Sequence, residues 1–349
     1  MSLKSLGTVF AVGARTAIGL DATQTALLLR TGIPAITAAP LASPTGDRVT
    51  MAFDATQDPF SVGENRAARL GLEALRDVAR PFGSAVRSLK LKAALAFPEA
   101  RPGQDKRTAG QTLASAMRAA LRETFGDPPV DLSSQGSAGL AFVLPAALRS
   151  LATRECEAVL VGGVHSDYDP EAIRTLDAAG RLFSPERIDA VVPGEAAAFA
   201  IVARDDFGGS YGLTPLAKIF AVSTTESDIT PYNDTSAFDA RALAEVISDA
   251  TAVLPDELRV GWAFGDQGFE HFRVRELYSA LSRTHQRWCE PIAIDAPAQR
   301  IGNTGAASLA LGLVLASDMF RRGYAPTPFG LLLAGSDNGE RAAILVGSP

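Results

Sequence analysis

The chain has 349 residues, of which 47% are hydrophobic and 21% are charged. This composition is typical of a globular protein with a sizeable core, and it excludes a disordered chain. The formal net charge is −6, and acidic and basic residues are mixed along the sequence. We therefore expect no nucleic-acid partner and no binding to an anionic membrane surface. No apolar run is long enough to predict a membrane span.

The two cysteines, Cys156 and Cys289, are too few for a disulfide framework and lack the spacing of metal ligands. We expect reduced thiols that pack as small hydrophobic side chains, in a cytoplasmic protein without a bound metal. Residues 1–20 carry one lysine and a short apolar run that glycine and arginine interrupt. This segment is predicted to be a first strand and turn, because a signal peptide needs a more continuous apolar region.

Apolar runs alternate with helical periodicities along the chain. In the first half they predict strands at 7–14, 91–97, 157–164 and 196–204, and helices at 21–32, 65–82, 107–126 and 139–156. In the second half they predict strands at 216–224, 258–265, 291–296 and 341–347, and helices at 237–254, 274–283 and 305–323. Strands that are apolar throughout are typical of parallel-rich sheets covered on both faces. We predict one compact α/β body of two similar halves, 1–208 and 209–349, with the boundary in the stretch 205–215.

The stretch DLSSQGSAGLAF, residues 131–142, has the features of a nucleophile elbow. A turn of small residues opens a helix, and the dipole at the helix N-terminus would favour a nearby negative charge. The stretch contains no cysteine. Its chemistry therefore depends on what the rest of the chain resembles.

Five segments, in the right order, resemble the β-ketoacyl synthase branch of the thiolase superfamily. They are VFAVGARTAIGLDATQTALLLRTGIPAI at the N-terminus, ECEAVLVGGVHS, AGRLFSPERIDAVVPGEAAAFAIVARDD, GNTGAASLALGLVLA and RRGYAPTP. The resemblance covers nearly the whole chain. It implies a thiolase-like five-layered αβαβα fold and a dimer.

The family's chemistry implies three catalytic positions. A cysteine at a helix N-terminus accepts an acyl group, and two further groups, His-His or His-Asn, drive decarboxylation of a malonyl unit. The resemblance puts the cysteine of elongating synthases at Gly136 and that of priming synthases at Ser137, ahead of Gly139. Gln135 is one step away, and chain-length-factor subunits carry glutamine in place of the cysteine. Ser137 is an alternative nucleophile or, as we expect, a helix cap, since a hydroxyl needs an adjacent base.

The second position corresponds to Phe264 in elongating synthases and to Asp266 in priming synthases. Phe264 is expected to pack in the core, and Asp266 to serve either the turn or proton transfer. His271 is close in sequence but matches neither pattern. The third position is Asn303, which matches the asparagine of priming synthases. Its amide is expected either to donate to a thioester carbonyl or to serve the turn that starts the helix.

Other polar residues are expected to be structural or solvated. Glu195 is predicted to be buried against backbone groups or an arginine, and His285 to be solvated. His165 corresponds to a site near the family's dimer core. The loop EARPGQDKR around Arg101 is expected to be exposed, with contact to a carrier phosphopantetheine as the alternative. The charged turn 335–341 replaces the glycine-rich gate of elongating synthases.

These observations support three hypotheses. The first is a β-ketoacyl synthase-like protein of fatty-acid or polyketide type that does not condense, resembles a chain-length factor and still binds a CoA or phosphopantetheine thioester. The second is an acyltransferase that uses Ser137 with Asn303 and Asp266. The third is an assembly subunit without a ligand. The expected partners are a second copy of the chain or a complete ketosynthase, and an acyl carrier protein.

Overall fold

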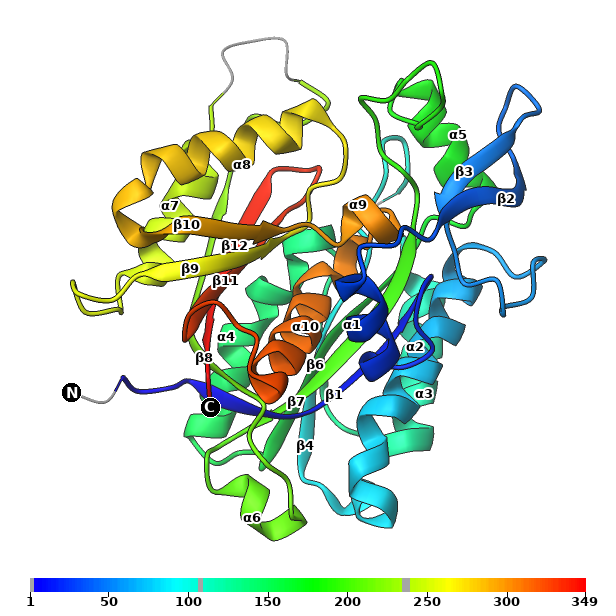
Figure 1. Ribbon diagram of the computed structural model, residues 1–349. Coiled ribbons are helices and arrows are strands. Elements are labelled where there is room, and N and C mark those ends of the chain that lie inside the picture. Colours follow the sequence, from blue (N-terminus) through cyan, green and yellow to red (C-terminus); the bar gives the residue numbers. More distant parts are fainter. Residues whose placement is uncertain (1–2, 106–108, 234–238) are drawn as a thin grey trace.

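The computed structural model describes residues 3–105, 109–233 and 239–349 (Figure 1). The first half contains β1 (Gly7–Thr16), α1 (Ala22–Arg30), β2 (Ile36–Ala42), β3 (Arg48–Ala52), α2 (Gly63–Ala79), β4 (Leu91–Ala96), α3 (Gln111–Phe125), β5 (Val130–Ser133), α4 (Gly139–Ala152), β6 (Ala158–Ser166), α5 (Pro170–Ala178), β7 (Glu195–Ala203) and α6 (Phe207–Tyr211). The second half contains β8 (Ala217–Glu226), α7 (Arg241–Thr251), β9 (Val260–Gly265), α8 (His271–Arg283), β10 (Trp288–Asp295), α9 (Ala298–Ile301), α10 (Ser308–Arg322), β11 (Phe329–Gly335) and β12 (Glu340–Gly347).

The strands of the two halves repeat one topology. The hydrogen-bonded order is β10-β9-β11-β12-β8-β1-β7-β6-β4-β5, so five strands of the second half are followed by five of the first. In each half the first strand pairs antiparallel with the last, and the remaining pairs have the same directions. The halves join where a short stretch of β1 pairs with β8. The body therefore contains one continuous ten-stranded sheet made of two similar mixed five-stranded sheets, one from each half.

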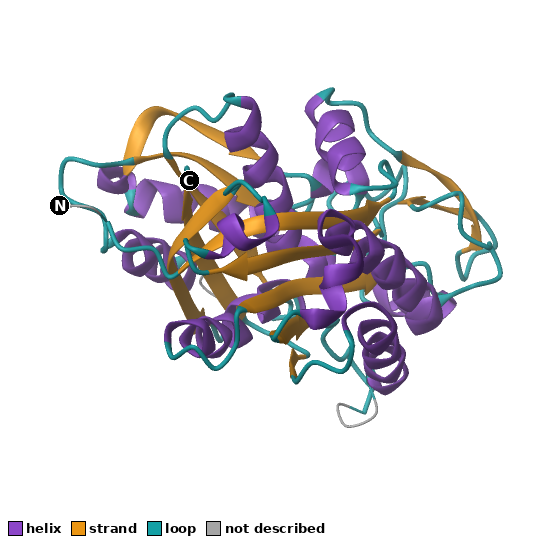
Figure 2. Ribbon diagram, turned by 90° about the horizontal axis from the view of Figure 1, so that it is seen from below, coloured by secondary structure: helices purple, strands orange, loops and turns teal. Residues whose placement is uncertain are grey.

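Helices cover the two sheets in layers. One core cluster joins α4 and α10 to strands of both halves, so these two helices form the middle layer. A second cluster packs α2 and α3 on the first sheet, and a third packs α7 and α8 on the second. Figure 2 shows the strands lying between these helices. The predicted five-layered αβαβα fold is confirmed.

The sequence patterns missed β2, β3, β5, α5 and α6 of the first half. The hairpin β2–β3 and helix α5 pack together around a small separate core that includes Met51, Tyr168 and Ile173. Their apolar residues are too few to produce a periodic signal. The predicted helix starts at 107 and 237 lie outside the described residues. The division at 208/209 falls inside α6, between β7 and β8, and stays a prediction.

Both central helices begin in the same way. Gly136 has a φ of 58° and opens a short 3-10 turn, Gly136–Ala138, that leads into α4. Gly305 has a φ of 44° and opens the turn Gly305–Ala307, which leads into α10. Such positive φ values favour glycine because a Cβ would clash with the backbone. The elbow predicted at 131–142 is therefore built twice, once in each half.

Candidate functional site

An open cavity of about 1000 Å³, open solvent included, lies where the loops of both halves meet. Its walls come from segments that follow strands: 98–102 after β4, 136–137 after β5, 165–167 at the end of β6, 266–270 after β9 and 335–338 after β11. Ligands of open α/β sheets bind beyond the carboxyl ends of strands in this way. Ser137, Asp266 and Asn303 all line the cavity, so the structure brings the three predicted catalytic residues into one site.

The elbow itself is tied to the turn between β11 and β12. The Ser336 hydroxyl accepts a hydrogen bond from the backbone N–H of Ala138 at 3.0 Å and donates to the carbonyl oxygen of Gln135. The Gln135 side chain accepts from the Ser133 hydroxyl at 3.0 Å. Gly139 is the first residue of α4. The charged turn 335–341 thus supplies a cap to the helix start.

The expectation that Ser137 caps the helix is wrong. Ala138, not Ser137, is the N-cap residue of α4, and the side-chain oxygen that accepts its backbone N–H is that of Ser336. The Ser137 side chain is 9% exposed and faces the cavity wall. Its hydroxyl makes no hydrogen bond to any residue in the described part of the chain, whereas a serine nucleophile is activated by a hydrogen bond to a base.

Glu99 occupies the space in front of the elbow. A Cβ built on Gly136 would lie 2.6 Å from Glu99 Oε1, closer than real Cβ contacts come. The Glu99 carboxylate accepts the backbone N–H groups of Asp337 and Asn338, each at 2.9 Å. Burial and then the charge of Asp337 raise the pKa of Glu99 to about 7. A carboxylate therefore stands where a side chain at position 136 would be.

The expectation of an exposed loop around Arg101 is confirmed for residues 102–105, which are exposed, but Arg101 itself is held in an ion pair. Arg101 Nη1 lies 2.8 Å from Asp169 Oδ2, and both side chains are largely buried. Glu99 belongs to the same loop and turns inward to the elbow. Lys106 and Arg107 of this loop lie outside the described residues.

The raised pKa of Glu99 predicts a pH dependence of stability. A carboxyl whose pKa is about 4.5 when unfolded and about 7 when folded stabilises the fold most when protonated, below about pH 4.5. This contribution is lost as the pH rises through about 7. We therefore compare thermal melts of Glu99→Gln and the unsubstituted protein between about pH 5 and pH 8, where the Glu99 carboxyl changes its charge in the folded state. The stability of the variant relative to the unsubstituted protein should increase as the pH rises. Glu245→Gln, an exposed control on α7, should show no such gain; a pH-independent effect of Glu99→Gln would contradict the prediction.

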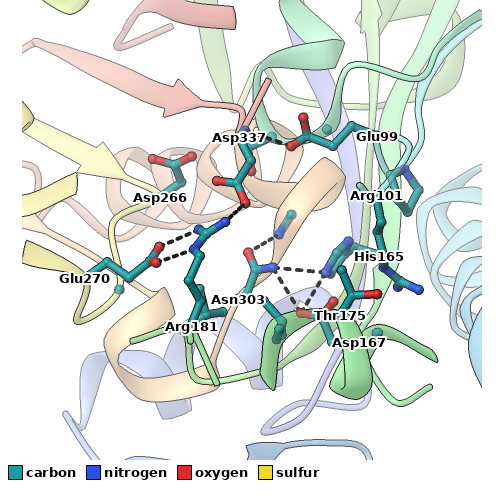
Figure 3. Close-up of a pocket in the computed structure, with 18 of the residues that line it drawn as sticks. Glu99, Arg101, His165, Asp167, Thr175, Arg181, Asp266, Glu270, Asn303 and Asp337 are labelled. Atoms are coloured by element: carbon teal, nitrogen blue, oxygen red, sulfur yellow. Dashed lines mark hydrogen bonds and ion pairs between the residues drawn. The ribbon is translucent and has the colours of Figure 1, made fainter. Parts of the chain in front are cut away.

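An ion-pair cluster fills the side of the cavity next to Glu99 (Figure 3). The Arg181 guanidinium contacts both Glu270 carboxylate oxygens at 2.6 and 2.8 Å, and Asp337 Oδ2 at 2.6 Å. Arg273 Nη2 donates to the other Asp337 oxygen at 2.7 Å. Burial raises the pKa of Asp337, but the two arginines outweigh it and hold that pKa well below its usual range. The cluster joins loops from both halves of the chain.

His165, Asp167 and Asn303 form a second polar group on the opposite wall (Figure 3). His165 Nε2 lies 3.1 Å from Asp167 Oδ2 and 3.2 Å from Asn303 Nδ2. Asn303 Nδ2 donates to Asp167 Oδ2 at 3.0 Å, and Asn303 Oδ1 accepts from Gly305 N at 3.0 Å. Burial raises the pKa of Asp167, but His165, Arg101 and the Asn303 amide outweigh it and lower that pKa. Asn303 therefore serves the turn and also faces the cavity.

Asp266 lies between the ion-pair cluster and the turn 335–341. Its Oδ2 accepts the backbone N–H of Gly335 at 2.9 Å, which is the turn role that the sequence predicted. Burial raises the pKa of Asp266, although the charge of Arg273 opposes the shift. The residue also lines the cavity, so its position leaves the alternative, proton transfer, open.

The other predicted positions lie away from this cavity. Phe264 packs in the central core, with its ring 5.5 Å from that of Trp262. His271 begins α8 and is exposed, as is His285. Cys156 is buried at the start of β6, the end opposite His165, and burial raises the pKa of its thiol. Neither cysteine lines the cavity.

Glu195 is buried and paired, as predicted. It is 0% exposed and binds Arg66 through contacts of 2.7 and 2.8 Å. It also accepts from Asp54 N at 2.7 Å and from the Ser166 hydroxyl at 2.8 Å. These bonds connect β7 to α2 and to Ser166, the residue that follows His165 at the end of β6. Glu195 thus stabilises the backbone that positions His165.

Sequence reasoning missed the residues that shape the cavity: Glu99, His165, Arg181, Arg273 and Asp337. Two of them carried a usable signal, because Glu99 and His165 stand at the carboxyl ends of the buried strands β4 and β6. Polar residues at that place are expected to face a ligand. The others come from loops whose pairing across the two halves only the fold reveals.

The fold is that of a thiolase-like α/β protein, and its cavity lies at the start of the two central helices, α4 and α10. Residues 95–207 match the family model described as "Beta-ketoacyl synthase, N-terminal domain". That segment is therefore similar to the N-terminal domain of β-ketoacyl synthases, and the whole chain has the ketosynthase fold. No curated protein sequence matches it significantly.

Solved ketosynthases share this fold at low sequence identity. The ketosynthase from module 6 of the bacillaene synthase from Bacillus subtilis 168 is 14% identical, with 98% of this chain and 72% of that chain covered and a TM-score of 0.76. A chain of AntDE:AntF, a type II PKS acyl-carrier protein in complex with its ketosynthase bound to the hexaketide, is 13% identical, with coverages of 98% and 99% and a TM-score of 0.80. The ishigamide ketosynthase/chain length factor is 14% identical, with coverages of 98% and 99% and a TM-score of 0.79.

The described residues also bear on membrane insertion and metal binding. None of their helices is long and apolar enough to cross a membrane. None of their His, Cys, Asp and Glu side chains gather into a group of three or more that could hold a metal ion.

Proposed function

We propose that the protein is a ketosynthase-like protein that does not condense acyl units and acts as a chain-length-factor-like or other non-catalytic subunit. The observation that carries this proposal is the elbow. Position 136 is glycine with positive φ, and the Glu99 carboxylate fills the place where a side chain would project. Condensation needs an acyl acceptor at the helix start, and neither cysteine of the chain lines the cavity.

The polar groups around the elbow support the same proposal. The arginines of the cavity are already in ion pairs, with Asp169, Glu270 and Asp337, so they hold no free charge for a developing enolate. His165 faces Asp167 and Asn303, and its Nδ1 packs against Gly305 without a partner among the described residues. Nothing in this arrangement activates the Ser137 hydroxyl.

Acylation by a CoA thioester tests the proposal. The protein is incubated with acetyl-CoA, butyryl-CoA and malonyl-CoA, and its intact mass and carbon dioxide release are measured. We expect no adduct and no decarboxylation, and identical results for Ser137→Ala. An adduct that Ser137→Ala abolishes would replace the proposal with the acyltransferase alternative, in which Ser137, Asn303 and Asp266 act from one cavity wall.

We further propose that the cavity binds the pantetheine arm of a CoA or carrier thioester without reacting. The mixed lining supports this, since alanine, leucine, valine and phenylalanine side chains lie between the polar groups. Thermal stabilisation by a pantetheine amide analogue is the expected result. Its absence at every concentration tested would favour the third hypothesis, an assembly subunit without a ligand.

We also propose that the chain forms a dimer with itself or with a complete ketosynthase, and that an acyl carrier protein binds it. Two structures similar to this chain support the proposal, because one is a ketosynthase in complex with an acyl-carrier protein and another is a ketosynthase/chain length factor. Light scattering of the purified chain should give twice the mass of one copy. A monomer that also stays apart from a co-expressed ketosynthase would contradict this.

A further inference from the structure

A second hollow, which we call the α1–α10 pocket, opens between helices α1 and α10 and the strands β9 and β10. Its volume is about 560 Å³, open solvent included, and it shares no lining residue with the cavity at the elbow. The pocket is therefore separate from the cavity at the elbow.

Apolar side chains form the walls of the α1–α10 pocket. They include Leu29, Trp262, Phe264, Ile294, Leu315 and Met319. The only polar atom of the Trp262 side chain, Nε1, donates to the carbonyl oxygen of Thr327 at 3.1 Å. The rest of the indole ring is a hydrocarbon wall. An apolar hollow that stays open to water is unfavourable for the free protein, and such hollows mark binding sites.

One cation without an ionic partner stands at the rim of the pocket. The Arg30 guanidinium lies 4.2 Å above the centre of the Tyr324 ring, and it has no ion pair among the described residues. The Tyr324 hydroxyl donates to Asp318 Oδ2 at 3.1 Å, which fixes the ring beneath Arg30. Stacking on an aromatic ring leaves the edge of a guanidinium free to bind a carboxylate.

The acidic residue at the rim is already neutralised. Asp295 Oδ1 lies 2.6 Å from Arg300 Nη2. The local charge that remains unpaired is therefore positive, and it belongs to Arg30. An apolar hollow with a single cation at its rim is complementary to an amphiphile with one anionic end.

We propose that the α1–α10 pocket binds a medium-chain aliphatic carboxylic acid, with its tail against Trp262 and Met319 and its carboxylate on Arg30. This site is independent of the elbow and of the proposed function. Phe264 is one of its lining residues. The ligand is bound and released without chemical change.

Binding of decanoate to the full chain tests this inference. Isothermal titration calorimetry should show one saturable site, and Arg30→Met should weaken it at least about tenfold, as the loss of a charge-assisted hydrogen bond implies. Arg118→Met, which removes an exposed arginine on α3, is the matched control and should leave the affinity unchanged. Decanol should bind the unsubstituted protein more weakly than decanoate, and this difference should vanish in Arg30→Met.

A second variant tests the tail. Ala293 is exposed on β10 and lines the pocket, so Ala293→Trp should fill the hollow and abolish binding of decanoate and decanol without disturbing the core. Thermal melts check that each variant is folded. The inference is overturned if decanoate shows no saturable binding to the unsubstituted protein, or if folded Arg30→Met or Ala293→Trp binds it with unchanged affinity.

Discussion

Replacing Arg66 by methionine is expected to lower the free energy of unfolding by about 3–5 kcal/mol, the usual cost of leaving a buried charge without its partner. Arg66 is 1% exposed, and its guanidinium holds both oxygens of Glu195, which is 0% exposed. The same guanidinium donates to the Asp54 carbonyl oxygen at 2.8 Å and stacks 4.0 Å from the centre of the Tyr168 ring. Urea unfolding of both proteins measures the difference.

Two further variants separate charge from packing. Arg76→Met removes an exposed ion pair with Glu73 and should cost less than about 1 kcal/mol. The double variant Arg66→Met with Glu195→Gln removes the uncompensated charge and should be more stable than Arg66→Met alone. If Arg66→Met costs no more than Arg76→Met, Glu195 does not depend on its partner and the prediction fails.

A cysteine introduced at position 136 is expected to destabilise the protein while Glu99 is present. The backbone there has a φ of 58°, which costs about 1–3 kcal/mol for a residue with a side chain, and the new Cβ would lie 2.6 Å from Glu99 Oε1. Glu99→Gly should relieve the second part only. In a double-mutant cycle we expect a coupling of about 1 kcal/mol or more between the two positions.

Gly32→Cys is the control for backbone strain. Gly32 has a φ of 76°, and no atom lies within 4 Å of a Cβ built there. The cost of Gly32→Cys should not depend on whether Glu99 is present.

The double variant Gly136→Cys with Glu99→Gly also allows a chemical test. Its new thiol at the start of α4 should react with a maleimide faster than the thiols of Cys156 and Cys289, because a helix N-terminus favours the thiolate. Additive costs for positions 136 and 99 would show that Glu99 does not fill the site.

The fold followed from the sequence because its signals are local. The strands β6 and β7 are buried over their whole length, and the long helices repeat apolar residues at helical spacing. The layered arrangement and the two similar halves could therefore be predicted. Glu195 was predictable for the same reason, since a carboxylate at the head of an apolar strand needs a buried partner. The hairpin β2–β3 lacked this signal because four of the seven residues of β2 are exposed.

The candidate site was predictable only in part. Ser137, Asp266 and Asn303 were found through resemblance, and the structure brings them to one cavity. The carboxylate of Glu99 against the elbow could not be predicted, because its partners, Asp337 and Asn338, are more than 200 positions away in the chain. The prediction that Ser137 caps the helix was wrong for a related reason. Its position and residue type favoured a local capping bond, but the hydroxyl that accepts the Ala138 N–H belongs to Ser336 in the other half.

The repeated start of the central helices bears on what the elbow alone can indicate. Gly136 and Gly305 occupy equivalent places in two halves with the same strand order. A glycine with positive φ therefore belongs to the backbone architecture of each half and not to one catalytic residue. The same turn can form with or without a nucleophile beside it, so the shape of the elbow does not measure its chemical activity.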